Sequence, residues 1–170
     1  MKRLFLVRHA KSSWEFGTLP DSERPLNERG YRDAPRVGDY LAGKYARPER
    51  VVSSPAIRAY STAFILCRRW DYPPGAIQLE SELYETDVES YAEVLSRQDD
   101  RAQSILLAGH NFSITHFLSH LLGKETGDMP TCSVAVIDLN LSAWAELRRG
   151  CGSLVELILP KALPNSEPNT

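Results

Sequence analysis

Short apolar runs typical of β-strands alternate with segments of helical periodicity along most of the chain. The runs lie at residues 3–7, 50–54, 77–79, 104–108, 133–139 and 154–159. Apolar residues recur at helical spacing in the segments that follow the first four runs. Such alternation favours parallel strands covered by helices on both faces. We therefore expect an α/β fold, a three-layer α/β/α sandwich with a mostly parallel sheet and an antiparallel pair near the C-terminus.

The first two helices have recognisable starting residues. Asn27 is a good N-cap, and Pro35 in the following helix predicts a kink or a restart because proline removes one backbone hydrogen bond. Ser54 and Pro55 suit the N-cap and first position of the second helix. The expected apolar stripes are Ala34, Val37 and Leu41 in the first helix, Ile57, Tyr60, Phe64 and Cys67 in the second, Tyr91, Val94 and Leu95 in the third, and Ile114, Phe117, Leu118 and Leu121 in the fourth.

The length and composition suit one folded domain. With 170 residues, 42% of them hydrophobic and 25% charged, the chain can form a core without disulfides or a structural metal. We assign residues 1–161 to a single domain and expect 162–170 to be a disordered polar tail. The cysteines Cys67, Cys132 and Cys151 are odd in number and lack CxxC spacing, so we expect reduced thiols.

Charge and hydropathy exclude several classes of protein. The net charge of -2 and the pI of about 6.1 argue against nucleic-acid binding, which favours a basic surplus. No apolar run approaches the roughly 20 residues of a membrane span, and the N-terminus is unlike a signal peptide. We therefore expect a cytoplasmic protein that binds neither nucleic acid nor membranes.

Cationic and imidazole side chains gather where three of the predicted strands end. Arg8 and His9 follow the first strand, Arg58 lies in the first turn of the helix after the second, and His110 and Asn111 follow the fourth. In open α/β sheets, ligands bind outside the carboxyl ends of the strands. Cations and helix N-termini that converge there predict an anion pocket, and two arginines suit a phosphoryl group.

Each of these residues also has an ordinary structural interpretation. Arg58 could be a solvated helix arginine, although a cation in the first turn opposes the helix dipole. His110 could cap or pack. His116 and His120 have the four-residue helical spacing of a zinc pair, but the HExxH glutamate is absent and no acidic ligand lies nearby in sequence. We favour a shared anion pocket for Arg58 and His110, and we expect no metal site at His116 and His120.

Several ordered blocks of the sequence match a known family. They are Leu6-Val7-Arg8-His9-Ala10 with Ser12 and Trp14, Ser53-Ser54-Pro55 with Arg58, Gly109-His110-Asn111, the segment Arg24-Pro25-Leu26-Asn27-Glu28-Arg29-Gly30, and Leu83-Tyr84. Together they resemble the histidine phosphatase (phosphoglycerate-mutase-like) superfamily, and within it the SixA-like phosphohistidine phosphatase branch. The match spans most of residues 3–122. Ala10 and Lys11 depart from the wider superfamily, which usually has glycine and often an acid there, but the SixA-like branch tolerates both.

The resemblance implies a role for each residue of the predicted pocket. His9 would be the nucleophile, with Arg8, Arg58 and His110 around the phosphoryl group and no metal or cofactor. A histidine that attacks phosphorus must be neutral, and the two arginines would lower its pKa. Its second ring nitrogen should donate to a carbonyl. Ser12 and Asn111 are expected to add substrate-binding donors.

The general acid is less well defined by the sequence. Larger members protonate an alkoxide leaving group with a glutamate in a Leu-x-Glu context, which Glu85 fits and for which Glu82 is an alternative. A solvated acidic loop is the competing interpretation. An imidazole leaving group needs less help than an alkoxide, so a missing acid would suit phosphohistidine.

Three functions follow, in decreasing order of preference. The first is a metal-independent phosphatase acting through phosphorylated His9 on phosphohistidine in a protein, since too few residues separate the third strand from the third helix to form a lid. The second is a phosphatase of a small phosphorylated metabolite with Glu85 as acid. The third, a noncatalytic phosphate-binding module, is disfavoured by the intact His9.

Overall fold

A six-stranded sheet forms the middle layer of the molecule. The computed structural model describes residues 1–164, and the strands in these residues run in the order β3-β2-β4-β1-β5-β6. Their bounds are Lys2–Arg8 for β1, Arg50–Ser53 for β2, Gln78–Leu79 for β3, Ser104–Gly109 for β4, Val134–Leu139 for β5 and Gly152–Ile158 for β6. The first four strands pair in parallel, while β5 pairs antiparallel with β1 and with β6. This sheet confirms the expected fold class.

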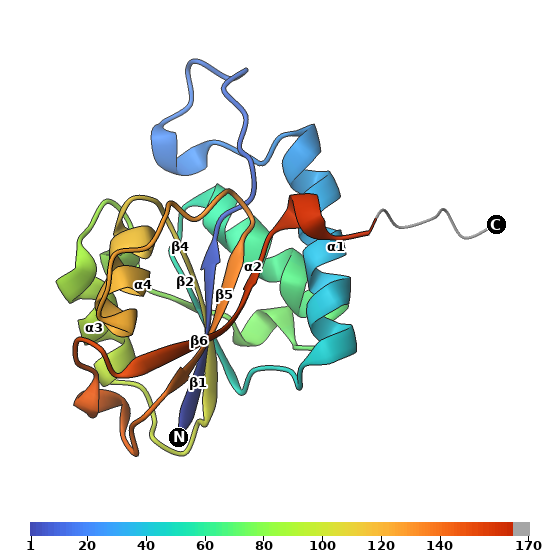
Figure 1. Cartoon of the computed structure of the whole chain (residues 1–170). Helices are drawn as coiled ribbons and strands as arrows, with labels where there is room; N and C mark the ends of the chain where they lie inside the picture. The colour runs from blue at the N-terminus through green and yellow to red at the C-terminus, as the bar shows by residue number, and fades with distance from the viewer. Residues whose placement is uncertain (165–170) are drawn as a thin grey trace.

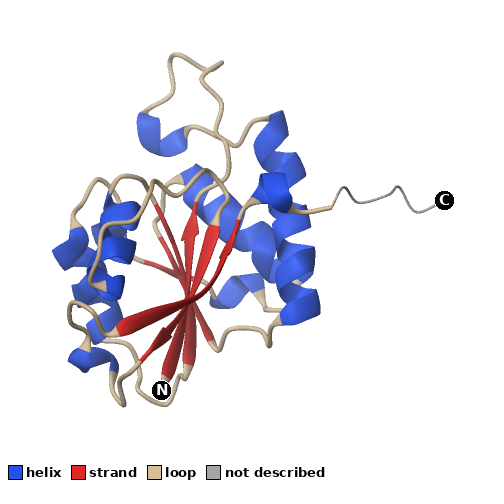
Figure 2. Ribbon diagram, viewed as in Figure 1, coloured by secondary structure: helices blue, strands red, loops and turns tan. Residues whose placement is uncertain are grey.

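Helices cover both faces of the sheet (Figures 1 and 2). Helices α1 (Glu28–Lys44) and α2 (Ile57–Arg69) lie on one face, and α3 (Val88–Ser96) and α4 (Ser113–Leu122) lie on the other. Alternate residues of β1 serve the two resulting cores: Phe5 and Val7 pack with α1 and α2, whereas Leu4 and Leu6 pack with α3 and α4. A strand buried on both faces explains why its sequence is a continuous apolar run.

Helix α1 runs through Pro35 as one continuous helix, so the restart expected there is wrong, while the alternative of a kink stays a prediction. The expected inner face of α2 was also wrong. The large apolar residues Ile57 and Phe64 of α2 are exposed. The buried face of α2 instead consists of Arg58, Ala59, Thr62, Ala63, Leu66 and Cys67. Small and polar side chains let this helix approach the sheet closely, so the pattern of large apolar residues misidentified its inner face.

The disorder expected from residue 162 onward is wrong for the first of these residues. A 3-10 turn, η5, covers Pro160–Ala162, and Leu163 packs against the core on the α1 side, where its carbonyl accepts a hydrogen bond from Arg36. Residues 165–170 of the expected tail lie outside the described residues. The three cysteines are unpaired and buried, as expected. Within residues 1–164, no helix combines the length and the apolar composition that crossing a membrane requires.

The sheet register brings the polar strand ends together. Arg8 of β1 is paired with Gly109 of β4, and Ser53 of β2 is paired with Ala108. The residues that follow these strands therefore leave the same edge of the sheet. The chain after β1 rises above this edge before it enters α1 (Figure 1), and it carries the short 3-10 turn η1 (Asp21–Glu23).

Candidate active site

His9 and His110 leave adjacent parallel strands and face one another. The backbone N–H of His9 donates to the carbonyl of Gly109 at 3.1 Å, and the two ring centroids lie 5.2 Å apart. Both imidazoles are buried, with 9% and 8% of their surface exposed. A Cβ at Gly109 would overlap the hydroxyl of Tyr91 in α3, so only glycine fits at this end of β4, directly before His110.

The local backbone fixes the tautomer of His9. Its Nδ1 lies 2.7 Å from the carbonyl oxygen of Ala10. That contact requires a proton on Nδ1 and leaves Nε2 with its lone pair, the form a nucleophile needs. Burial, followed by the nearby charges of Arg58 and Arg8, lowers the pKa of His9 to about 4. The sequence suggested the arginines as the cause, but burial is the larger effect.

His110 is held by a serine that the sequence misassigned. Its Nε2 lies 2.8 Å from Oγ of Ser54, which also accepts from the N–H of Ala56. Ser54 is therefore not the N-cap of α2, which starts at Ile57 with no side-chain cap. If Ser54 donates to Nε2, the proton of a neutral His110 sits on Nδ1. Burial first, and then His9, lowers the pKa of His110 to about 3.

Both predicted arginines are anchored through their terminal nitrogens. A terminal nitrogen of Arg8 donates to the carbonyl of Met129 at 2.7 Å. The two terminal nitrogens of Arg58 donate to Asp21, one to its carbonyl at 2.7 Å and the other to its carboxylate at 2.9 Å. Neither anchor uses Nε, so each guanidinium keeps an inward N–H without a protein partner.

Unpaired buried nitrogens concentrate at this edge. Among the described residues, only four buried side-chain N or O atoms lack a hydrogen-bond partner, and three of them are Nε of Arg8, Nε of Arg58 and Nδ1 of His110. Leaving a buried donor unpaired costs about 1–3 kcal/mol, so such groups are rare unless a ligand satisfies them. A phosphoryl group has three equatorial oxygens that can accept from such donors. The imidazole of His9 lies beside that of His110, and it is close enough to Arg8 and Arg58 for their charges to lower its pKa.

Three further residues of the site were not predicted from sequence. Asp21 accepts from Arg58, from the hydroxyl of Tyr84 at 2.7 Å and from Arg24 at 3.0 Å. These bonds, that of Tyr84 first, hold the pKa of the Asp21 carboxyl far below its usual range. Arg24 is buried and stacks on the ring of Trp14, 3.6 Å from its centroid. The segment Arg24 to Gly30 belonged to the resemblance, but no local pattern marked Asp21.

The comparisons with known proteins identify the family. Residues 4–104 match the model of the histidine phosphatase superfamily, branch 1. The chain belongs to the histidine phosphatase superfamily. A crystal structure from Agrobacterium tumefaciens, assigned as the phosphohistidine phosphatase SixA, is 28% identical, covers 94% of this chain and 98% of its own, and has a TM-score of 0.80. This likeness supports the SixA-like branch and makes the protein a phosphatase with a histidine nucleophile.

Two further relatives are informative. An uncharacterised protein of Mycobacterium tuberculosis, Rv1276c, is 28% identical over 166 residues, which is 91% of this chain and all of that protein. A mycobacterial glucosyl-3-phosphoglycerate phosphatase in complex with VO3 is 17% identical over 92% of this chain and 98% of its own, with a TM-score of 0.69. At that identity, the second likeness concerns the fold alone.

The remaining predicted residues of this histidine phosphatase differ in their placement. Oγ of Ser12 accepts from Arg24 at 2.9 Å, and the side-chain oxygen of Asn111 accepts from Thr115. Both are thus tied to neighbouring protein groups, and their binding of substrate stays a prediction. Asn111 and Glu85 line the groove above Arg58 and His110.

Glu82 and the helical histidine pair lie elsewhere. Glu82 is exposed and pairs with Arg97 at 2.9 Å, which lowers its pKa, and it does not line the groove. The ring of His116 stacks on Phe112 and that of His120 on Phe117. No three metal-ligating side chains gather closely enough within residues 1–164 to hold a metal ion.

Proposed function

We propose that this phosphatase hydrolyses phosphohistidine in a protein, without a metal, through a phosphohistidine intermediate on His9. The observation that carries the proposal is the set of three unpaired buried nitrogens beside an imidazole whose Nδ1 is tied to Ala10. Fixed donors aimed at the position where charge develops are usually the largest contribution to catalysis of this kind.

The geometry supports two successive transfers. Nε2 of His9 attacks phosphorus and the bond from phosphorus to the substrate nitrogen breaks. Its electron pair goes to the leaving imidazole, which departs neutral because its other ring nitrogen already carries a proton. Water then attacks the phosphorylated His9, the bond to Nε2 breaks, and the proton lost by water ends on inorganic phosphate. In both steps Arg8, Arg58 and His110 donate to the equatorial oxygens. The neutral form of His9 required for attack is available above about pH 4.

The surroundings of the site favour a large substrate. Only the short segment 80–87 separates β3 from α3, and it contains no helix beyond the 3-10 turn η3 (Ser81–Leu83). The groove beside Arg58 and His110 is open and has a volume of about 660 Å³. A side chain that projects from a protein surface can enter such a groove, whereas nothing there encloses a small molecule.

One observation favours a second candidate, a phosphatase of a small phosphorylated metabolite. Glu85 lines the same groove as Arg58 and His110, where a carboxyl group could protonate an alkoxide leaving group. A metabolite ester would need such an acid more than phosphohistidine does. The role of Glu85 therefore separates the two candidates.

A side-by-side turnover assay tests the proposal. We expect faster hydrolysis of a phosphohistidine protein than of any phosphate monoester in a panel, with EDTA present throughout and little loss in Glu85→Gln. An acid-labile phosphoenzyme should form in the wild type and be missing in His9→Ala. Comparable rates on a monoester, abolished by Glu85→Gln, would instead support the metabolite phosphatase.

A further inference from the structure

The groove that holds the phosphoryl-binding residues has an acidic wall. Its lining combines Arg58 and His110 with the segment 85–89, which carries the carboxylates of Glu85, Asp87 and Glu89. We call these three carboxylates the acidic wall. Opposite charges therefore lie within one groove, so a ligand with a phosphoryl group at one end meets negative charge along the rest of its length.

The wall differs from the acidic residues just before it in the chain. Glu80 and Glu82 each pair with Arg97 at 2.9 Å. In contrast, no Lys, Arg or His nitrogen of residues 1–164 lies within ion-pair distance of the acidic wall. Asp87 caps α3 by accepting from the N–H of Ser90, whereas Glu89 is exposed and caps nothing. The wall thus presents to the groove three carboxylates that have no ion-pair partner.

A second observation points to a ligand in this groove. His110 and Arg58 line it, are 8% and 7% exposed, and carry buried nitrogens without a protein partner. A phosphoryl group satisfies these donors, but a dianion that approaches the acidic wall is repelled unless the rest of the ligand is cationic. The two parts of the groove are therefore complementary to a zwitterionic ligand.

We propose that the acidic wall binds lysine or arginine side chains that flank the phosphohistidine of the partner protein. This inference rests on the proposed function and adds the chemistry of the partner. It also implies rejection of polyanionic metabolites, because carboxylates or further phosphates would lie against the wall.

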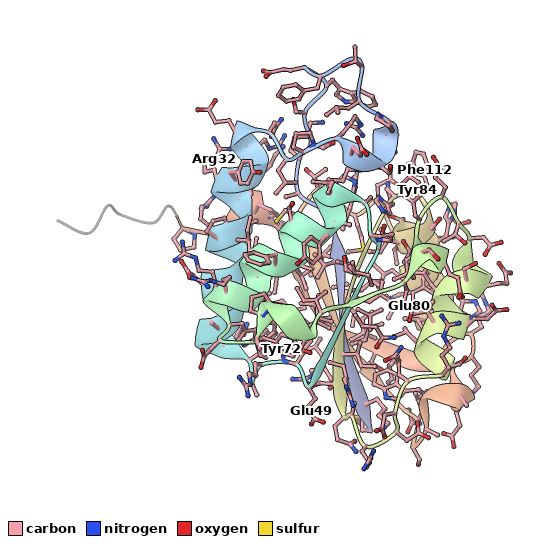
Figure 3. All side chains as sticks on the ribbon, turned by 180° about the vertical axis from the view of Figure 1, so that it is seen from behind. Arg32, Glu49, Tyr72, Glu80, Tyr84 and Phe112 are labelled. Carbon is pink, nitrogen blue, oxygen red and sulfur yellow. The ribbon has the colours of Figure 1, made fainter. Side chains whose placement is uncertain are left out.

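An exposed aromatic residue in the groove supports a polypeptide occupant. Phe112 lines the groove and is 65% exposed, and Figure 3 shows it at the same end of the molecule as Tyr84, which lines the groove too. An exposed aromatic ring at a binding groove offers apolar contact to a peptide. An apolar side and an acidic side together match a basic segment of a protein surface.

The test compares two phosphohistidine peptides of equal length, one flanked by lysines and the other by glutamates. We measure kcat/KM for each at low and at high salt, for wild type, Glu85→Gln/Glu89→Gln and the control Glu93→Gln. Glu93 is an exposed acid of α3 that does not line the groove. Any contribution of Glu85 to the chemical step affects both peptides equally, so it cancels in the ratio of the two kcat/KM values.

We expect the wild type and Glu93→Gln to favour the lysine peptide about tenfold at low salt, and high salt to reduce that ratio, as for other solvent-exposed charge pairs. The double variant should show a ratio severalfold closer to one. Equal rates on both peptides, or an unchanged ratio in the double variant, would overturn the acidic-wall inference while the proposed function stands. Failure to hydrolyse either peptide or free phosphohistidine would overturn both.

Discussion

Two clusters of arginines in this molecule each surround one aspartate, yet they differ in where the carboxylate sits. On α1, Asp33 lies at the centre of Arg29, Arg32 and Arg36, at 3.5, 3.6 and 3.6 Å, and its side chain is only 4% exposed. At the strand ends, Asp21 lies at the outer rim, 42% exposed. It accepts from Arg24 and Tyr84 as well as from Arg58, and of Arg58 it engages the terminal nitrogens and not Nε.

The difference shows what distinguishes a candidate active site from a structural ion cluster. In the α1 cluster the carboxylate lies within ion-pair distance of all three arginines, and the adjoining pocket is lined by no imidazole, thiol or hydroxyl. Nε of Arg36 is unpaired there too, but no nucleophile accompanies it. At the strand ends, the unpaired donors belong to Arg8, Arg58 and His110, and His110 lies beside the nucleophile His9. Arginine content alone would have ranked the two clusters equally.

The largest expected effect is that of His9→Ala, which removes the proposed nucleophile. We expect turnover of a phosphohistidine substrate to fall at least about a thousandfold, as is usual when a covalent nucleophile is lost. The variant should fold, because a residue at a strand exit contributes little to the core. Activity and a thermal melt are measured together, with His120→Ala, outside the groove, as the matched control. Near-wild-type turnover in a folded His9→Ala would refute the assignment.

The comparison of the two clusters becomes sharper with lysine substitutions. Arg58→Lys keeps the charge but loses the planar fork that holds Asp21 and presents Nε, so we expect a loss of roughly tenfold to a thousandfold in rate. Arg32→Lys in the α1 cluster should leave the rate unchanged. Vanadate should raise the melting temperature of the wild type and of Arg32→Lys, and that of Arg58→Lys less. If vanadate raised the melting temperature of all three proteins equally, the two arginine clusters would not differ in phosphoryl binding.

The convergence of Arg8, His9, Arg58 and His110 was predictable from sequence because each follows a strand or starts a helix at one edge of a parallel sheet. Elements of this kind are defined by local patterns, and the fold class fixes which of their ends meet. The expectation that the second ring nitrogen of His9 contacts a carbonyl is confirmed, although the sequence did not indicate which nitrogen or that the carbonyl is that of the next residue, Ala10.

Asp21, Tyr84 and Ser54 could not be assigned in this way. Asp21 and Tyr84 come from irregular segments whose positions depend on tertiary contacts, and they are 63 residues apart in sequence. Ser54 precedes a proline, a typical N-cap pattern, but its hydroxyl forms a hydrogen bond with Nε2 of His110 instead. Residues that support the catalytic groups are thus less visible in the sequence than those groups themselves.

Acid should destabilise the strand-end site through its two buried histidines. Their folded pKa values of about 4 and about 3 lie below the value of about 6.5 in an unfolded chain. Between these values the unfolded chain binds protons that the folded protein does not, so stability falls as pH drops below 6.5. We expect about 1–2 kcal/mol of unfolding free energy to be lost per histidine between pH 7 and pH 5.

Urea unfolding at several pH values measures this loss. His110→Asn removes one of the two groups, so the decline in unfolding free energy between pH 7 and pH 5 should become about half as steep. An equal slope in wild type and variant would show that His110 is not kept neutral by burial. Carboxylates such as Asp21 contribute only at lower pH, because their pKa lies far below this range.

The smallest expected effects come from removing the two aspartates, and they should differ in kind. Asp21→Ala removes the carboxylate that holds Arg58 and leaves only the backbone carbonyl of the anchor. We therefore expect the rate to fall about tenfold, the scale of one lost charge-assisted hydrogen bond, with little change in stability. Asp33→Ala leaves three arginines crowded without their carboxylate, and we expect it to lower the unfolding free energy by about 1–2 kcal/mol while the rate is unchanged.

If Asp21 acts through Arg58, adding Asp21→Ala to Arg58→Ala should cause no further loss of rate, because coupled residues are not additive. Steady-state rates and urea unfolding are measured for Asp21→Ala, Asp33→Ala, Arg58→Ala and the double variant Asp21→Ala/Arg58→Ala. A full tenfold loss in the Arg58→Ala background would mean that Asp21 contacts the substrate itself, and a loss of rate in Asp33→Ala would mean that the α1 cluster is not merely structural.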